Sequence, residues 1–135
     1  MYGTATALEA FATVGLFDDP AAIRCKAWLL SAQNEDGSWG GSQGMAGTVE
    51  ETAWALSALL ARGVHAPFRC LERAAAWLVK QQREDGTWPP SVIGIYFPSF
   101  WYSDDHIANG FALRALGRYW QARTHSLHAA TVRRL

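Results

Sequence analysis

The sequence predicts an all-α protein built from helical hairpins that pack as part of an α/α toroid, a partial α/α barrel. A stretch bounded by tryptophans occurs twice, and an Ala-rich helical stretch alternates with it. No segment has a convincing strand pattern. Repeats of this period are typical of arrays in which each unit packs on its neighbours, so we expect the Ala-rich helices inside and the Trp-bounded helices outside.

The Trp-bounded stretch spans residues 28–39 and again residues 77–88, at an offset of 49 residues without a gap. The matching residues are Arg24, Trp28, Gln33, Asp36, Gly37 and Trp39 in the first copy and Arg73, Trp77, Gln82, Asp85, Gly86 and Trp88 in the second. In both copies Asp-Gly breaks a helix and Trp follows on a turn. The Ala-rich stretches 4–11 and 52–59 align at an offset of 48 residues, so the repeating unit is a pair of helices.

Local signals place the helix ends. The expected helices are 4–14, ended by Gly15; 20–33, begun by Asp19 and Pro20; 48–62, begun by a Thr48–Glu51 capping box and ended by Gly63; 67–82, begun by Pro67; and 105–122, capped by Ser103 or Asp104. Residues 89–102 form the largest irregular segment and are rich in aromatic side chains.

We therefore expect residues 1–122 to form a partial barrel domain and residues 123–135 a polar tail, either disordered or a short helix. An open array exposes the apolar faces of its terminal hairpins. The chain therefore resembles part of something larger, or one protomer of an assembly.

Composition excludes several classes of function. Lys plus Arg equals Asp plus Glu, so no basic field is available for nucleic acid. No window is long and apolar enough for a transmembrane segment, and no secretory signal begins the chain. We expect no metal and no other cofactor, because no His, Cys or carboxylate cluster has the spacing of metal ligands. The expected compartment is the cytoplasm, and peripheral membrane attachment stays open for a complete enzyme.

The pattern of Arg, a small residue, an aromatic residue, Gln, Gly and Trp resembles the QW motif of squalene–hopene and oxidosqualene cyclases, which are class II terpene cyclases. Residues 73–88 fit the whole motif, and residues 24–39 fit it except at Cys25. Segments 2–4, 52–56, 97–98 and 115–119 look like successive blocks of the C-terminal third of a squalene–hopene cyclase, so that the resemblance covers residues 2–122.

The resemblance implies an α/α barrel in which each motif Gln bonds the start of a neighbouring helix and each motif Trp stacks on that Gln. A Gln amide can satisfy free N–H groups at a helix end, and a buried Trp supplies area and one donor. On this interpretation the QW residues are structural. They are Gln33, Gly37, Trp39, Gln82, Gly86 and Trp88.

Cyclases of this family protonate an alkene with the central Asp of a DxDD motif, and they line their cavity with aromatic rings. This chain has no DxDD motif, and its nearest string is Tyr102-Ser103-Asp104-Asp105. The resemblance suggests cavity-lining roles for Phe97, Phe100, Trp101, Tyr102, Asp104 and Asp105. Two simpler interpretations stand beside it: the aromatic segment covers the core, and the two aspartates are N-terminal helix charges.

The favoured interpretation is the C-terminal cavity-wall and scaffold part of a squalene–hopene-cyclase-like isomerase, inactive alone because it lacks the acid. The complete enzyme would take an apolar, squalene-like polyprenoid, and the missing part would come from an N-terminal acid-bearing domain or from a homo-oligomer. The alternative is a small helical-repeat module without catalysis, which binds an apolar ligand or partner or self-associates.

Overall fold

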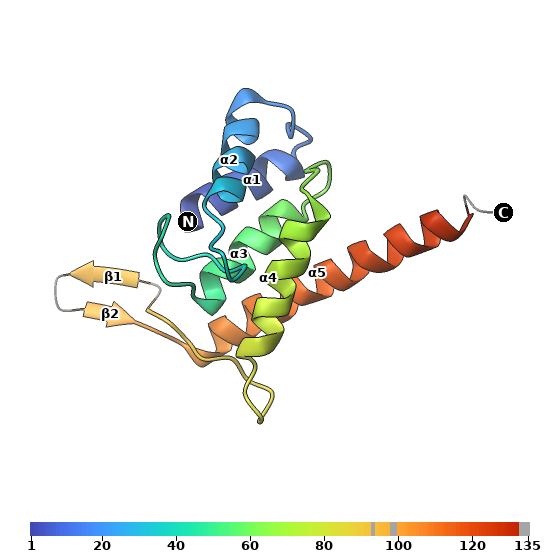
Figure 1. The fold of residues 1–135 in the computed structure, drawn as a ribbon. Coiled ribbons are helices and arrows are strands. Elements are labelled where there is room, and N and C mark those ends of the chain that lie inside the picture. The colour runs from blue at the N-terminus through green and yellow to red at the C-terminus, as the bar shows by residue number, and fades with distance from the viewer. Residues whose placement is uncertain (93, 98–99, 133–135) are drawn as a thin grey trace.

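The computed structural model describes residues 1–92, 94–97 and 100–132, with side-chain surroundings for residues 1–92 and 102–125. In chain order its elements are α1 (Tyr2–Thr13), α2 (Pro20–Ser31), α3 (Val49–Leu59), α4 (Phe68–Gln81), β1 (Gly94–Phe97), β2 (Phe100–Tyr102) and α5 (Asp105–Val132). The helices form the body of the molecule, which confirms the predicted all-α class (Figure 1).

The five described helices form two layers around α3. Helix α3 packs against α1 and α5, which makes an inner layer of Ala-rich helices. Helix α2 packs on α1, and α4 packs on α3 and α5, so the two Trp-bounded helices form the outer layer. Alanines 53, 55 and 58 of α3 are buried, and their small side chains let the neighbouring helices approach closely. This alternation of inner and outer helices is the predicted α/α arrangement.

Side-chain caps set two of the helix starts. The Asp19 carboxylate accepts a hydrogen bond from the Ala21 N–H at 2.7 Å and begins α2. The Thr48 hydroxyl accepts one from the Glu51 N–H at 3.2 Å and begins α3. The expected capping box is only half formed, because the Thr48 N–H donates instead to the Trp39 carbonyl at 3.0 Å. The start of α3 is thereby tied to the preceding turn.

Two stretches differ from the prediction. Within 89–102, which was expected to be irregular, β1 and β2 form an antiparallel pair with Gly94 opposite Tyr102. Aromatic and β-branched residues fit a pleated ribbon, which explains the hairpin. Helix α5 continues to Val132 without a break at residue 122. The hairpin and the end of α5 extend to opposite sides of the body (Figure 1). The division of the chain into a domain and a tail stays a prediction.

Candidate functional site

The two QW tryptophans are bound by their own outer helices. Trp39 is 0% exposed and Trp88 is 2% exposed. The indole N–H of Trp39 donates to the Leu29 carbonyl at 2.7 Å, and that of Trp88 donates to the Leu78 carbonyl at 2.7 Å. Each ring therefore supplies buried apolar area while its only polar atom is satisfied by the C-terminal part of the preceding helix.

The backbone of each QW tryptophan is held by the next inner helix. The Trp39 N–H donates to the Thr52 hydroxyl of α3 at 3.0 Å, and the Trp88 N–H donates to the Asn109 amide oxygen of α5 at 2.8 Å. Thr52 and Asn109 are at equivalent positions, two residues before the aromatic residue of each inner helix. The structure therefore repeats at the level of single hydrogen bonds, from outer helix to turn to inner helix.

Each QW glutamine donates hydrogen bonds to backbone carbonyls of its own turn or of the neighbouring helix. The Gln33 amide N–H₂ donates to the carbonyls of Gly37 and Cys70, each at 3.0 Å, and Gln82 donates to the Gly86 carbonyl at 2.8 Å. The expected contact was an N–H donation from a helix start to the Gln oxygen, whereas these contacts are donations to carbonyls. Gly37 and Gly86 have φ of 95° and 84°, a backbone conformation that favours glycine. The assignment of the QW residues as purely structural stays a prediction.

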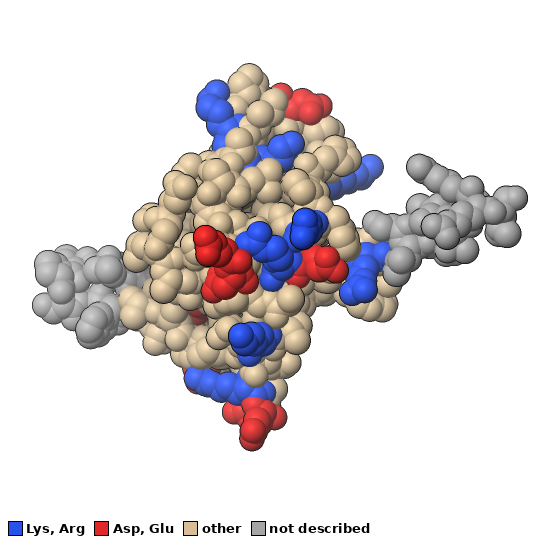
Figure 2. Space-filling model, viewed as in Figure 1, with Lys and Arg blue, Asp and Glu red and all other residues tan. Residues whose placement is uncertain are grey.

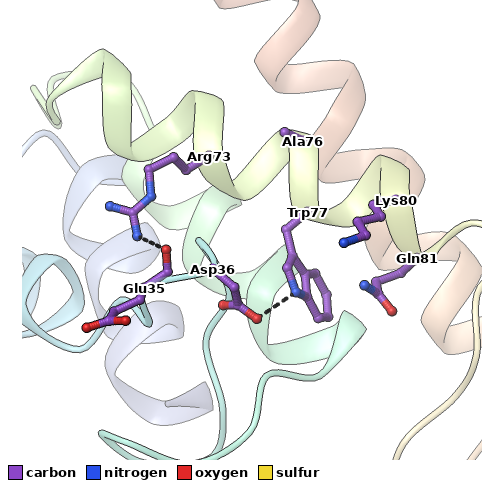
Figure 3. Close-up of a pocket in the computed structure, with 7 residues that line it drawn as sticks. All are labelled: Glu35, Asp36, Arg73, Ala76, Trp77, Lys80 and Gln81. Carbon is purple, nitrogen blue, oxygen red and sulfur yellow. Dashed lines mark hydrogen bonds between the residues drawn. The ribbon is translucent and has the colours of Figure 1, made fainter.

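A pocket of about 570 Å³ lies between the first QW motif and α4. Figure 3 shows the Trp77 indole directed at Asp36 across this space, and the indole N–H donates to the carboxylate at 3.0 Å. The Arg73 guanidinium donates to the carbonyls of Asn34 at 2.6 Å and Glu35 at 3.0 Å. Arg73 and Glu35, like Lys80 on the same wall, are exposed charged residues. The pocket therefore lies at a joint between two hairpins, and the exposed charged side chains around it do not suit an apolar polyprenoid.

Hydrogen bonding lowers the pKa of Asp36. Partial burial acts in the opposite direction, but donation from the Ser38 hydroxyl, the Ser38 N–H and the Trp77 indole outweighs it and holds the pKa below the usual range. The Ser38 hydroxyl donates at 2.6 Å and the Ser38 N–H at 3.0 Å. Asp36 is therefore an ionised acceptor at neutral pH, and no proton-donating role follows from its environment.

A row of aromatic rings crosses the inner layer. The ring centroids of Tyr2 in α1 and Trp54 in α3 lie 4.4 Å apart, and those of Trp54 and Phe111 in α5 lie 5.0 Å apart. Tyr2 is 56% exposed, so one end of the row is open to solvent. These residues were not predicted as site residues from the sequence. The repeat contained a signal, because Trp54 and Phe111 hold the same position in two neighbouring inner helices.

The predicted aromatic cavity residues fall mostly on the hairpin. Phe97 ends β1, and Phe100 and Trp101 lie in β2, with side chains outside the described residues. Tyr102 is described and is 43% exposed. A cavity-lining role for these four residues stays a prediction.

The two predicted acidic residues lie at the start of α5. One carboxylate oxygen of Asp104 accepts a hydrogen bond from the His106 N–H at 2.7 Å, which is the geometry of a helix N-cap. Asp105 is exposed in the first turn of the helix. These contacts suit helix N-terminal charges, and a cavity role for either residue stays a prediction.

A buried carboxylate that the sequence analysis missed joins α3 to the segment after the second QW motif. Glu50 is 0% exposed. Its two oxygens accept from the Ser91 N–H at 2.8 Å and from the Ser91 hydroxyl at 2.6 Å. Glu50 lies in the first turn of α3, where the helix dipole favours a negative charge. No local pattern in the sequence pairs it with a serine 41 residues away.

None of the helices in the described residues is both long and apolar enough to cross a membrane. Within the same part of the chain, no three His, Cys, Asp or Glu side chains gather in a way that could hold a metal ion.

The two-layer helical repeat, closed at each turn by a buried Trp, defines an α/α toroid protein of the kind that builds barrels from helical hairpins. The family of the squalene–hopene cyclase C-terminal domain matches residues 1–121, and the chain belongs to that family.

Two curated relatives agree with this family. The chain is 39% identical over 75 residues to a squalene–hopene cyclase of Bradyrhizobium diazoefficiens, with 47% of this chain and 11% of that protein covered. It is 41% identical over 75 residues to a squalene–hopene cyclase of Zymomonas mobilis, with the same coverage of 47% and 11%. The matched part is therefore a small share of each relative.

Proposed function

We propose that this chain forms part of the cavity wall and scaffold of a cyclase that converts a linear, squalene-like polyprenoid into a cyclic product after protonation. Family membership over residues 1–121 supports the reaction class. The observation that carries the role of this chain is the aromatic row of Tyr2, Trp54 and Phe111 across the three inner helices. A partly open aromatic surface on the inner layer is the feature that such a wall requires.

The chemistry explains why aromatic rings suit this wall. Proton-initiated cyclisation passes through carbocations, and the face of an aromatic ring carries negative charge that attracts a cation. Such an attraction is worth about 2 kcal/mol or more when the site is desolvated. Rings also exclude water, which would otherwise quench a cation. We further propose that Tyr102 and the aromatic residues of the hairpin extend this surface.

In this proposal the acid comes from outside these 135 residues. A carboxylic acid that protonates an alkene must stay protonated in a dry, hydrogen-bonded site. The chain contains no DxDD motif, and Asp36, Asp104 and Asp105 are all at the surface or only half-buried. Glu50 is buried, but both of its oxygens accept hydrogen bonds from Ser91. Catalysis therefore needs an acid-bearing domain beside this chain.

The test is to combine the purified chain with the acid-bearing N-terminal part of a squalene–hopene cyclase, add squalene, and detect cyclic products by gas chromatography and mass spectrometry. We expect no product from the chain alone and product from the combination. Product from the chain alone would contradict the proposal, as would a stable complex of the two parts that forms none.

A matched pair of variants tests the wall itself. Trp54→Ala should reduce product formation in the combination about tenfold or more, since it removes the central ring of the row. Trp120→Ala is the control, because Trp120 is 66% exposed on α5 and has no ring partner among the described residues. Equal loss in both variants would argue against an aromatic wall at Trp54.

A further inference from the structure

The first QW turn (residues 33–39) and the second QW turn (residues 82–88) have the same internal hydrogen bonds. One carboxylate oxygen of Asp36 accepts from the N–H and hydroxyl of Ser38, at 3.0 and 2.6 Å. One carboxylate oxygen of Asp85 accepts from the N–H and hydroxyl of Thr87, at 2.9 and 2.6 Å. The two turns therefore share the Asp carboxylate and the turn backbone, while Asn34 of the first turn corresponds to Arg83 in the second.

Helix α4 covers the first QW turn. Its Arg73 donates to the carbonyls of Asn34 and Glu35, and its Trp77 donates to the second carboxylate oxygen of Asp36. The helix lies so close that a Cβ added at Gly37 would be 2.7 Å from the Arg73 carbonyl oxygen. Gln33 of the turn donates in return to the Cys70 carbonyl of α4, so four side-chain hydrogen bonds and a close backbone approach define this joint.

No described helix covers residues 82–86 of the second QW turn, although Trp88 at its end is buried. Gln82, Asp85 and Gly86 are exposed, whereas Gly37 is buried and Gln33 is half-buried. A Cβ added at Gly86 would meet only the Gln82 amide nitrogen, at 4.0 Å. The second carboxylate oxygen of Asp85 has no described partner. The second turn therefore has the acceptor groups that α4 binds in the first turn, but no described helix binds them.

The donors that fit this surface are on α2. Arg24 and Trp28 are spaced four residues apart, as Arg73 and Trp77 are, and they hold the same positions in the repeat. Arg24 is exposed, and neither its guanidinium nor the Trp28 indole N–H has a described hydrogen-bond partner. Each molecule therefore has one unused set of donors, on α2, and one unused acceptor turn, the second QW turn.

We propose that a second copy of this chain docks its α2 on the second QW turn and repeats the internal joint between molecules. Arg24 of one copy donates to the backbone carbonyls of Arg83 and Glu84 of the other, and Trp28 donates to Asp85. Figure 1 shows α2 and the loop after α4 at opposite ends of the body, so one molecule cannot make this contact with itself. The loop carries the acidic Glu84 and Asp85, opposite in charge to Arg24, together with the basic Arg83, and acidic and basic side chains lie side by side at that end of the molecule (Figure 2).

The contact is head-to-tail, so each added copy leaves one donor half and one acceptor half free. Such an interface produces a ring where the rotation closes and an open chain where it does not. Apolar side chains are exposed at both ends of the array, with Ile23 of α2 at 48% and Leu113 of α5 at 61%. Their burial would add hydrophobic area to the polar joint. This association needs no catalysis and is independent of the proposed function.

The test uses light scattering after size exclusion across a range of protein concentration. The wild-type chain should form species heavier than its 14.9 kDa monomer, in increasing proportion as concentration rises. A donor variant, Arg24→Ala with Trp28→Phe, and an acceptor variant, Asp85→Asn, should each need about tenfold or more protein to associate. Asp85→Asn suits this purpose because its oxygen can keep the Thr87 bonds while its N–H₂ group faces the Trp28 donor.

The matched control is Lys26→Ala on α2, which removes the same kind of charge as the donor variant from a position outside the proposed joint and should associate as the wild type does. Circular dichroism checks that every variant is folded. The decisive measurement mixes the donor and acceptor variants in equal amounts. Each then has one intact half that matches the other, so the mixture should form a dimer and stop there.

Three results would overturn the proposal. The first is a wild-type chain that stays monomeric at every concentration, including one that instead binds the acid-bearing part of a cyclase. The second is an oligomer that neither variant weakens, which would place the contact elsewhere. The third is a pair of variants that fail to form a dimer when mixed. Because the readout is mass, none of these outcomes depends on cyclase activity.

Discussion

The indole N–H of Trp77 donates to the carboxylate of Asp36 at 3.0 Å, and these residues belong to two different helical hairpins. Each residue has an equivalent in the other repeat: Trp28 corresponds to Trp77, and Asp85 corresponds to Asp36. Within the described residues, Trp28 has no Asp partner and Asp85 has no Trp partner. A substitution in the bonded copy can therefore be compared with the same substitution in the unbonded copy of the same chain.

The Trp77–Asp36 contact should stabilise the fold, whereas Trp28 should not in the monomer. Trp77→Phe keeps most of the ring and removes the donor, so we expect a loss of about 1 kcal/mol in the free energy of unfolding. Trp28→Phe should change that free energy by less than about 0.5 kcal/mol, because its N–H has no described partner. Urea unfolding at low protein concentration measures both. Equal effects would show that Asp36 contributes nothing through this bond.

Alanine at the two turn glycines should have unequal costs. Gly37→Ala and Gly86→Ala both place a Cβ at positive φ, which costs about 1–2 kcal/mol. At Gly37 the new Cβ would also meet the Arg73 carbonyl at 2.7 Å, so α4 must shift and we expect a further loss of about 1–3 kcal/mol. Thermal unfolding compares the two variants, and a Gly86 variant that is the less stable one would refute this account of the joint.

Acid should weaken the joint between α4 and the first QW turn. Hydrogen bonds hold the pKa of Asp36 below its ordinary value of 3.8 in the folded chain. The folded state therefore binds fewer protons, so this stabilisation is present above about pH 4 and is lost as pH falls through the lowered value. Unfolding experiments between neutral pH and about pH 2 should show a smaller pH dependence in Asp36→Asn than in the wild type. An unchanged dependence would assign acid sensitivity to other carboxylates.

Removal of the Ser91 hydroxyl should leave a buried carboxylate poorly satisfied. Ser91→Ala deletes the 2.6 Å bond to Glu50, which is 0% exposed, and we expect a loss of about 1–3 kcal/mol in the free energy of unfolding. Ser42→Ala is the control, because Ser42 is exposed and its hydroxyl has no described partner. Chemical denaturation measures both variants. A neutral Ser91→Ala would mean that the remaining N–H bond is sufficient for the buried Glu50.

Local chemistry allowed much of the fold to be predicted. Asp19 and Thr48 accept the first free N–H groups of their helices, and Gly15 adopts positive φ directly after the C-cap of α1, as expected. Helix α3 was expected to continue to residue 62, but it ends at Leu59, before Gly63. The QW resemblance was likewise visible in residues a few positions apart, and the family match over residues 1–121 confirms it. These features depend on neighbours in sequence, which is why the sequence reveals them.

Less of the candidate site was predictable. The hairpin was missed because its strands pair with each other rather than with a sheet that would impose a buried, alternating face. The row of Tyr2, Trp54 and Phe111 joins three helices, and its existence depends on how α1, α3 and α5 pack. Trp54 and Phe111 could have been paired through the repeat, but Tyr2 has no equivalent there.

The sequence alone determined the repeat itself: two matching turns, each with Gln, Asp, Gly and Trp, and the starts of the helices that follow Asp19 and Thr48. Only the tertiary structure decided that these turns differ, since α4 buries Gly37 while Gly86 stays exposed. The physical reason is that a turn's internal bonds are made by adjacent residues, whereas its cover is made by a helix that arrives from elsewhere in the chain. Two turns with the same internal hydrogen bonds therefore differ in their surroundings: the first is covered by α4, and residues 82–86 of the second stay exposed.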